Sequence, residues 1–216
     1  MSGRETRNTS SKVEVRADGE KRKIIGYGAV FYDGSRGTEY WLWDDMVERI
    51  MPGAFDRALR EDDVRGLFNH DSNMVLGRTS AGTMRLSSDA TGLRYEIDPG
   101  DTQVGRDVLQ HVSRGDVSGS SFSFIPTKTT WRENDDILVR EIEEVKLYDV
   151  GPVTFPAYEG TTADSRSRRG VSEERRAALL EERSAFIERT KLVPQVSGAE
   201  MDARIADMRL KELGIG

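Results

Sequence analysis

Alternating polar and apolar positions run through the first three-quarters of the chain and predict a β-rich fold. Residues 12–17 alternate with a period of two, a turn follows at Asp18 and Gly19, and residues 22–31 form the expected hairpin partner. The same signal predicts further strands at residues 64–68, 74–77, 83–86, 93–97, 129–132, 137–142 and 145–150. We therefore expect an α+β fold with a mainly antiparallel sheet that is curled or closed like a β-barrel.

Two flanking helices are predicted beside this sheet. Residues 54–60 place a short apolar face on one side, and residues 102–114 carry the clearer helical pattern. Thr102 is suited to cap the start of this second helix, and Gly115 to end it. Residues 32–45 are expected to form a loop, whose rings either pack in the core, which we favour, or line a substrate groove: Tyr40, Trp41 and Trp43.

The two ends of the chain differ from this middle part. Residues 1–11 lack apolar periodicity and are expected to be flexible, and residues 159–170 have the composition of a linker. Residues 171–191 and 199–213 are rich in Glu, Arg, Ala and Leu at helical spacing. We expect a main domain over residues 12–158 and a helical tail over residues 171–216.

Composition narrows the chemistry. A net charge of −6 and a pI near 5.2 disfavour a phosphate-tracking surface, so no nucleic-acid partner is expected. No apolar stretch approaches the roughly 18 residues needed to span a membrane. The chain has no cysteine and two histidines, so we expect neither disulfides nor a metal centre, and no cofactor.

The candidate chemistry lies where a serine-rich turn enters a strand, at residues 116–124. A serine hydroxyl becomes a good nucleophile when an imidazole takes its proton and an acid orients the imidazole. Ser118, Ser120 and Ser121 are candidate nucleophiles, His70 at a strand end is the candidate base, and Asp149 in a mostly apolar strand is the candidate acid.

Each of these residues also has a purely structural interpretation. The serines suit an ordinary turn, His70 suits a loop that bonds backbone, and Asp149 suits a cap before Gly151. His111 lies on the polar flank of the second helix and is expected to be solvated. Spacing alone leaves these alternatives open.

Several segments in the same order carry a family resemblance. They are residues 26–31, 51–55, 64–71, 76–79 with 82–83, 119–124 and 150–157. Together they resemble the prohead maturation proteases of tailed bacteriophages, a group related to the herpesvirus capsid protease assemblin. The resemblance runs from about residue 12 to residue 165.

This resemblance implies a serine endopeptidase that acts in the host cytoplasm, inside the immature capsid. Its implied substrates are scaffold or the scaffolding arm of the major capsid protein, and often the protease itself. Motif by motif, the histidine matches His70, the nucleophile matches Ser121 with Ser118 and Ser120 as weaker options, and the acid matches Asp149. The chain departs from the usual pattern at Ser123, where Gly is usual, and at Gly151, where Ser is usual.

Other expectations follow from the resemblance or stand against it. Arg78 either helps to stabilise the oxyanion that forms during the reaction or forms a buried structural ion pair, and we favour the ion pair. The helical tail fits a scaffold-like role or a dimer-forming appendage, so a homo-oligomer is possible. The competing classes are a non-catalytic capsid-assembly protein and a metal-dependent hydrolase that uses His70 and Asp71.

Overall fold

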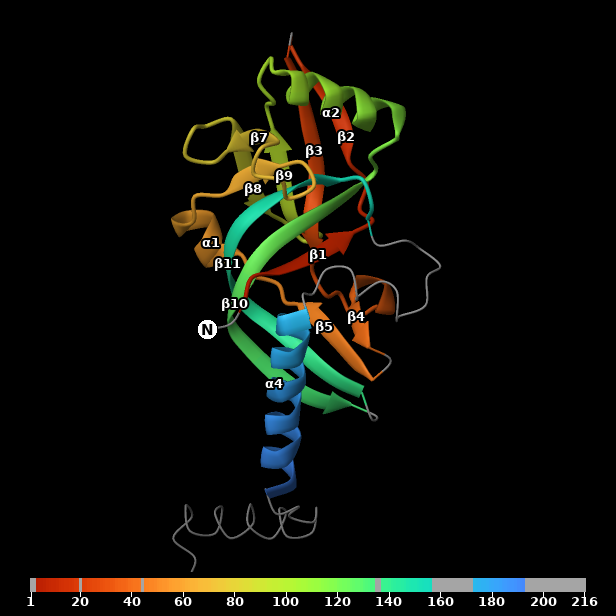
Figure 1. Cartoon of the computed structure of the whole chain (residues 1–216), viewed down its shortest axis with the longest axis vertical. Helices are drawn as coiled ribbons and strands as arrows, with labels where there is room; N and C mark the ends of the chain where they lie inside the picture. The colour runs from red at the N-terminus through yellow and green to blue at the C-terminus, as the bar shows by residue number, and fades with distance from the viewer. Residues whose placement is uncertain (1–2, 20, 44, 135–136, 157–172, 193–216) are drawn as a thin grey trace, which may run out of the picture. The chain divides into compact units, whose positions relative to one another are not determined.

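The computed structural model describes residues 3–19, 21–43, 45–134, 137–156 and 173–192 (Figure 1). The chain divides into two compact units, Met1–Ala178 and Leu179–Gly216. The predicted linker at residues 159–170 and the second tail helix at residues 199–213 lie outside the described residues. The expected C-terminal helix is present as α4 (Glu173–Leu192).

The α+β class is confirmed, since strands dominate the first unit and few helices accompany them (Figure 1). The helices of this unit are α1 (Asp56–Glu61), α2 (Gln103–Arg114) and the 3-10 turn η1 (Arg36–Thr38). Its strands are β1 (Glu5–Thr9), β2 (Glu14–Asp18), β3 (Lys21–Val30), β4 (Tyr40–Trp43), β5 (Met46–Ile50), β6 (Arg65–Leu67), β7 (Val75–Arg78), β8 (Met84–Ser88), β9 (Gly92–Ile97), β10 (Gly119–Asn134) and β11 (Ile137–Val153).

The strands form two sheets. The larger sheet has the order β1-β10-β11-β5-β4, with β6 pairing both β11 and β7, and the smaller has the order β2-β3-β9-β8. Most pairs are antiparallel, but β11 runs parallel to β5 and to β6. In the described part of the chain the pairing does not close into a barrel, so the expected closure is not confirmed.

Two long antiparallel strands, β10 and β11, lie next to each other in the middle of the larger sheet. The segments predicted as separate strands at residues 129–132, 137–142 and 145–150 are parts of β10 and β11, which pair along most of their length. Register shifts interrupt this ladder near residues 123 and 128, and such bulges bend a strand pair. Figure 1 shows the two strands curving together along the unit. β11 therefore pairs with β5 at one end and with β6 at the other.

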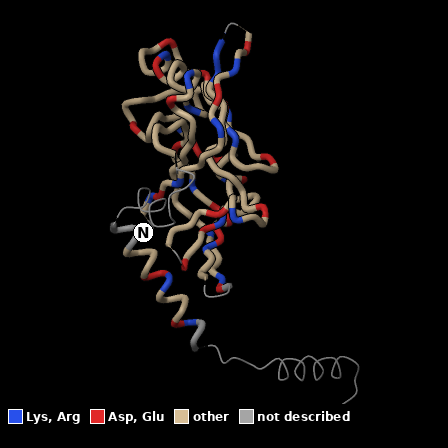
Figure 2. The backbone as a smooth tube through the Cα atoms, turned by 90° about the vertical axis from the view of Figure 1, so that its right-hand side faces the viewer, with Lys and Arg blue, Asp and Glu red and all other residues tan. Residues whose placement is uncertain are grey.

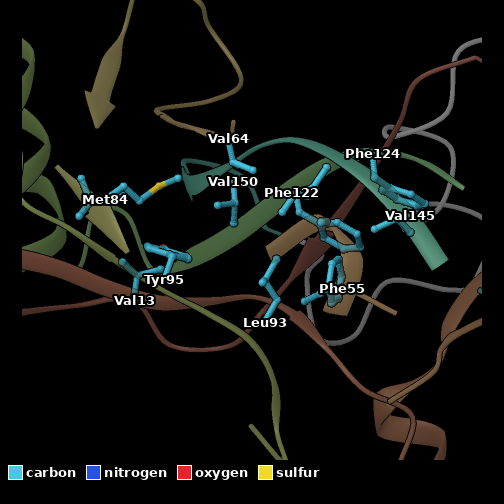
Figure 3. Packing of buried hydrophobic residues seen from close by; sticks show 14 of the residues in the cluster. Val13, Phe55, Val64, Met84, Leu93, Tyr95, Phe122, Phe124, Val145 and Val150 are labelled. Atoms are coloured by element: carbon cyan, nitrogen blue, oxygen red, sulfur yellow. The ribbon is translucent and has the colours of Figure 1, made fainter. Parts of the chain in front are cut away.

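The core lies under the β10 strand. Phe122 stacks on Phe124 with ring centroids 4.8 Å apart and meets Phe55 edge to face at 5.6 Å. Figure 3 shows these rings beside Val145, with Tyr95 and Leu93 of the smaller sheet in the same cluster. Because side chains alternate along a strand, Ser121 and Ser123 lie on the opposite face of β10 from these phenylalanines.

Residues 1–11 were expected to be flexible, and this expectation is wrong for residues 5–9. They form β1, which pairs antiparallel with residues 120–124 of β10. Three of its five residues are buried, and they are Glu5, Arg7 and Thr9. Because charged side chains occupy inward positions, the sequence of this strand does not show the apolar alternation that predicts strands.

Residues 40–43 were expected to lie in a loop, and this expectation is also wrong, because they form β4 against β5. Leu42 is buried there, whereas Trp41 and Trp43 are only half-buried. The aromatic pattern therefore marks an edge strand.

The second predicted helix is confirmed as α2. The Thr102 hydroxyl accepts a hydrogen bond from the Gly105 amide at 3.0 Å, and Gly115 ends the helix with a φ of 83°. Basic and acidic residues are interspersed along the first unit (Figure 2). Among the described helices, none is long and apolar enough to cross a membrane.

Candidate active site

Strand β10 positions the candidate serine. Ser121 lies between Asn8 of β1 and Gly151 of β11 in the ladder, and its side chain is completely buried. Its hydroxyl points to the face of the sheet that Phe122 does not occupy. A central strand therefore holds this hydroxyl in place from both sides.

The turn between β6 and β7 positions the histidine. Asn69 and His70 both have left-handed backbone conformations, with φ values of 54° and 58°. Such conformations cost roughly 1 kcal/mol or more for residues other than glycine and need support from their surroundings. The Asn69 side chain supplies it, because it donates to the Thr154 hydroxyl at 2.9 Å and accepts from the Thr154 amide at 2.8 Å. These two hydrogen bonds hold the turn against Thr154, the residue that follows β11.

Strand β11 positions the acid. Asp149 lies opposite Ser123 in the ladder, and its side chain is 1% exposed. A buried carboxylate needs partners for its oxygens. One of these partners is His70, whose Nδ1 hydrogen-bonds to Oδ1 of Asp149.

The three predicted residues come together. His70 Nε2 lies 2.6 Å from the Ser121 hydroxyl oxygen, while Nδ1 of the same ring contacts Asp149. With Nδ1–H donating to the carboxylate, the lone pair of Nε2 faces the serine hydroxyl. The arrangement is that of a nucleophile, a base and an acid that orients the base.

The Ser121 hydroxyl has a second acceptor within reach. The backbone carbonyl of Arg7 on β1 lies 3.0 Å from it. A hydroxyl has one proton to donate, so the Arg7 carbonyl and His70 Nε2 compete for it.

An arginine that the sequence did not indicate also reaches this site. The Arg4 guanidinium donates to Oδ2 of Asp149 and to the Ser123 hydroxyl, and it lies 4.6 Å from the centre of the Tyr148 ring. The Ser123 hydroxyl therefore accepts a hydrogen bond from Arg4. No pattern in residues 1–11 marked Arg4, because β1 was not expected.

The other candidate serines are not brought to His70. Ser120 is buried on the core side of β10, where its hydroxyl shares a hydrogen bond of 2.8 Å with Tyr95. Ser118 is exposed just before β10 begins, and its carbonyl accepts from the Val13 amide. Neither arrangement includes the imidazole.

The remaining candidates also have partners elsewhere. His111 is exposed and lies 3.4 Å from Asp116. Asp71 accepts from the backbone and side chain of Asn73 within its own turn. Arg78 forms an ion pair with Asp63, as favoured, but the pair is exposed and not buried.

The comparison with protein families shows which family the chain belongs to. A family model described as caudovirus prohead serine protease matches residues 11–175, well over half of the chain. The chain belongs to this family. The match includes His70, Ser121 and Asp149, whereas Arg4 and strand β1 precede it. Comparisons with curated proteins and with solved structures return no match.

Proposed function

We propose that this prohead protease family member is a serine endopeptidase of capsid maturation. It acts in the host cytoplasm, inside the immature capsid, on scaffold or on the scaffolding arm of the major capsid protein. The observation that carries the proposal is His70, whose two ring nitrogens contact Ser121 and Asp149. Family membership supports the same reaction class.

The first half of the reaction forms an acyl-enzyme. The Ser121 oxygen attacks the carbonyl carbon of the scissile peptide bond, and its proton passes to His70 Nε2. The C–N bond then breaks, and His70 returns that proton to the leaving amine. Asp149 stays ionised, accepts from Nδ1–H and stabilises the imidazolium that forms.

The second half releases the enzyme. His70 takes a proton from a water molecule, whose oxygen attacks the acyl carbonyl. The ester bond to Ser121 breaks, the serine oxygen recovers the proton, and the second product leaves with a new carboxylate. Backbone amides that point at the developing oxyanion would lower both barriers.

The test uses the full-length chain and its cognate capsid precursor, scored on a gel. Wild type is expected to give fragments, and Ser121→Ala is expected to give none. Ser118→Ala is the matched control, because this serine lies three residues away and is exposed, and it should cleave like wild type. Equal fragments from Ser121→Ala and wild type would overturn the proposal, as would their absence from every form.

A non-catalytic assembly role predicts a different outcome in the same system. Capsids made with Ser121→Ala would then mature normally. Under the protease proposal they are expected to stop at the precursor stage with uncut scaffold.

Self-cleavage is part of the proposal, with the helical tail around α4 acting as a scaffold-like segment. Purified wild type is expected to shorten on incubation, whereas Ser121→Ala keeps its full mass. Identical intact masses for the two forms would remove self-cleavage without removing cleavage of the capsid precursor.

A further inference from the structure

The triad carboxylate has a partner on each oxygen. Oδ1 of Asp149 contacts His70 Nδ1, and Oδ2 accepts from the Arg4 guanidinium. We infer that Arg4 is a positioning residue for catalysis, which fixes the rotation of the Asp149 carboxylate and thereby the tilt of the His70 ring. The inference rests on the proposed protease function, and the family match, which begins at residue 11, does not include Arg4.

Burial is the reason that the carboxylate needs this second partner. The Asp149 side chain is 1% exposed, so water does not serve an oxygen left without a donor. With one anchor, the carboxylate is free to rotate about its bond to Cβ. With donors on both oxygens it has a single orientation, and His70 is held in line with Ser121.

Two further contacts hold the guanidinium in place. The Nε–H of Arg4 donates to the Ser123 hydroxyl, which is 2% exposed, and the guanidinium lies over the Tyr148 ring. A glycine at position 123 would offer no such acceptor. The Ser123 hydroxyl therefore helps to hold the guanidinium beside Asp149.

The register of β1 delivers Arg4 to the correct face. Residues 5–9 pair with residues 120–124, and a slip by one residue would turn every side chain of β1 to the other face. A fully buried ion cluster opposes such a slip. Arg7 contacts Glu48 at 2.8 Å and Glu5 at 2.6 Å, and Arg140 contacts both of these carboxylates. Polar groups buried in this way are well suited to fix a register.

The experiment compares Arg4→Ala and Arg4→Lys with Arg132→Ala in the full-length chain. Arg132 is the matched control, because it lies on β10, is partly exposed and pairs with Glu141 at 2.8 Å, as Arg4 pairs with Asp149. For Arg4→Ala we expect kcat to fall roughly tenfold to a hundredfold with little change in KM. Guanidinium added to Arg4→Ala should restore part of the lost kcat. The kcat of Arg4→Lys should lie between those of wild type and Arg4→Ala, because a single ammonium group cannot reproduce the paired N–H donors of a guanidinium.

Two readouts separate positioning from a general loss of structure. The unfolding midpoint of Arg4→Ala should fall below that of Arg132→Ala, because only Arg4→Ala leaves an oxygen of a buried carboxylate without a donor, so kcat is measured at a temperature well below both midpoints, where both variants are folded. The proton resonance of His70 Nδ1–H should shift in Arg4→Ala and stay in place in Arg132→Ala. This resonance needs no substrate.

Either of two kinetic results overturns the inference. Equal kcat for Arg4→Ala and the control removes the positioning role, and a higher kcat means that the contact holds an inactive form. If wild type cleaves nothing, the proposed function fails by itself. The His70 resonance still decides whether Arg4 orients the carboxylate, since an unshifted signal excludes it.

Discussion

Ser121 and Gly151 lie directly opposite each other in the β10–β11 ladder, and the missing side chain at Gly151 lets the histidine-bearing turn approach the serine. A Cβ at position 151 would lie 2.1 Å from the Leu67 carbonyl oxygen at the end of β6. That atom belongs to the backbone just before Asn69 and His70. The absence of a side chain at position 151 is therefore part of the spacing of the site.

Gly151→Ala is expected to push β6 away and to separate His70 from Ser121. Overpacking of this kind costs roughly 1–3 kcal/mol, measurable by chemical denaturation. Cleavage of the capsid precursor should fall by more than that stability loss explains. Gly37→Ala is the control, because its new Cβ would meet only the Ser35 hydroxyl, at 3.8 Å. Wild-type activity in Gly151→Ala would contradict this account.

Asn69→Ala tests the support of the left-handed turn. The substitution removes both hydrogen bonds between the Asn69 side chain and Thr154 and leaves His70 on a turn without that tie. We expect a stability loss of about 1–3 kcal/mol and a lower kcat. Asn73→Ala, in the same turn, removes a contact with Asp71 and should leave kcat unchanged. If both variants lower kcat equally, the turn as a whole matters and the tie to Thr154 does not.

The sequence predicted those elements whose pattern is local. Helix α2 carries its own cap at Thr102 and its own stop at Gly115, and the hairpin of β2 and β3 turns at Gly19, just after Asp18. Strand β1 was not predicted, because the residues that it buries are the polar Glu5, Arg7 and Thr9. Their burial depends on Glu48 and Arg140, which lie far away in the chain. The parallel pairing of β5 with β11 is equally non-local.

The site residues also differ in whether the local sequence could predict them. Residue types and spacing left three serines open, and only the resemblance favoured Ser121 among them. The alternation of Phe122 and Phe124 contained a usable signal, because it places Ser120 with the apolar face and Ser121 on the opposite face. Arg4 had no such signal, since its contact with Asp149 joins residues 145 positions apart.

The ion pair of Asp63 and Arg78 gives a prediction for pH dependence. The Arg78 hydrogen bonds hold the pKa of Asp63 well below its usual value of 3.8. A depressed carboxylate pKa adds stability above the unfolded-state pKa and loses it as the pH falls toward the folded-state pKa. Wild type should thus exceed Asp63→Asn in stability at neutral pH, and the difference should shrink below about pH 4. Because the pair is exposed, added salt should reduce the difference as well.

Unfolding curves collected from pH 2 to pH 7, at low and high salt, measure that difference. A gap between wild type and Asp63→Asn that stays constant with pH would show that the ion pair is not its source.

The buried cluster of Glu5, Arg7, Glu48 and Arg140 has two charges of each sign. β1 contributes Glu5 and Arg7, so the two residues that other strands contribute, Glu48 and Arg140, also balance each other. Burial opposes the charge of Arg7, but Glu48 and Glu5 outweigh it, so the pKa of Arg7 is raised. Glu5→Leu or Arg7→Met alone leaves an uncompensated buried charge, which we expect to cost about 3–5 kcal/mol. The double variant removes one charge of each sign and should cost much less than the sum of the two single changes. Chemical denaturation of the four forms gives the coupling energy directly. Additive losses would mean that each side chain stabilises β1 through packing alone, and the buried charges would then not set the register that brings Arg4 to Asp149.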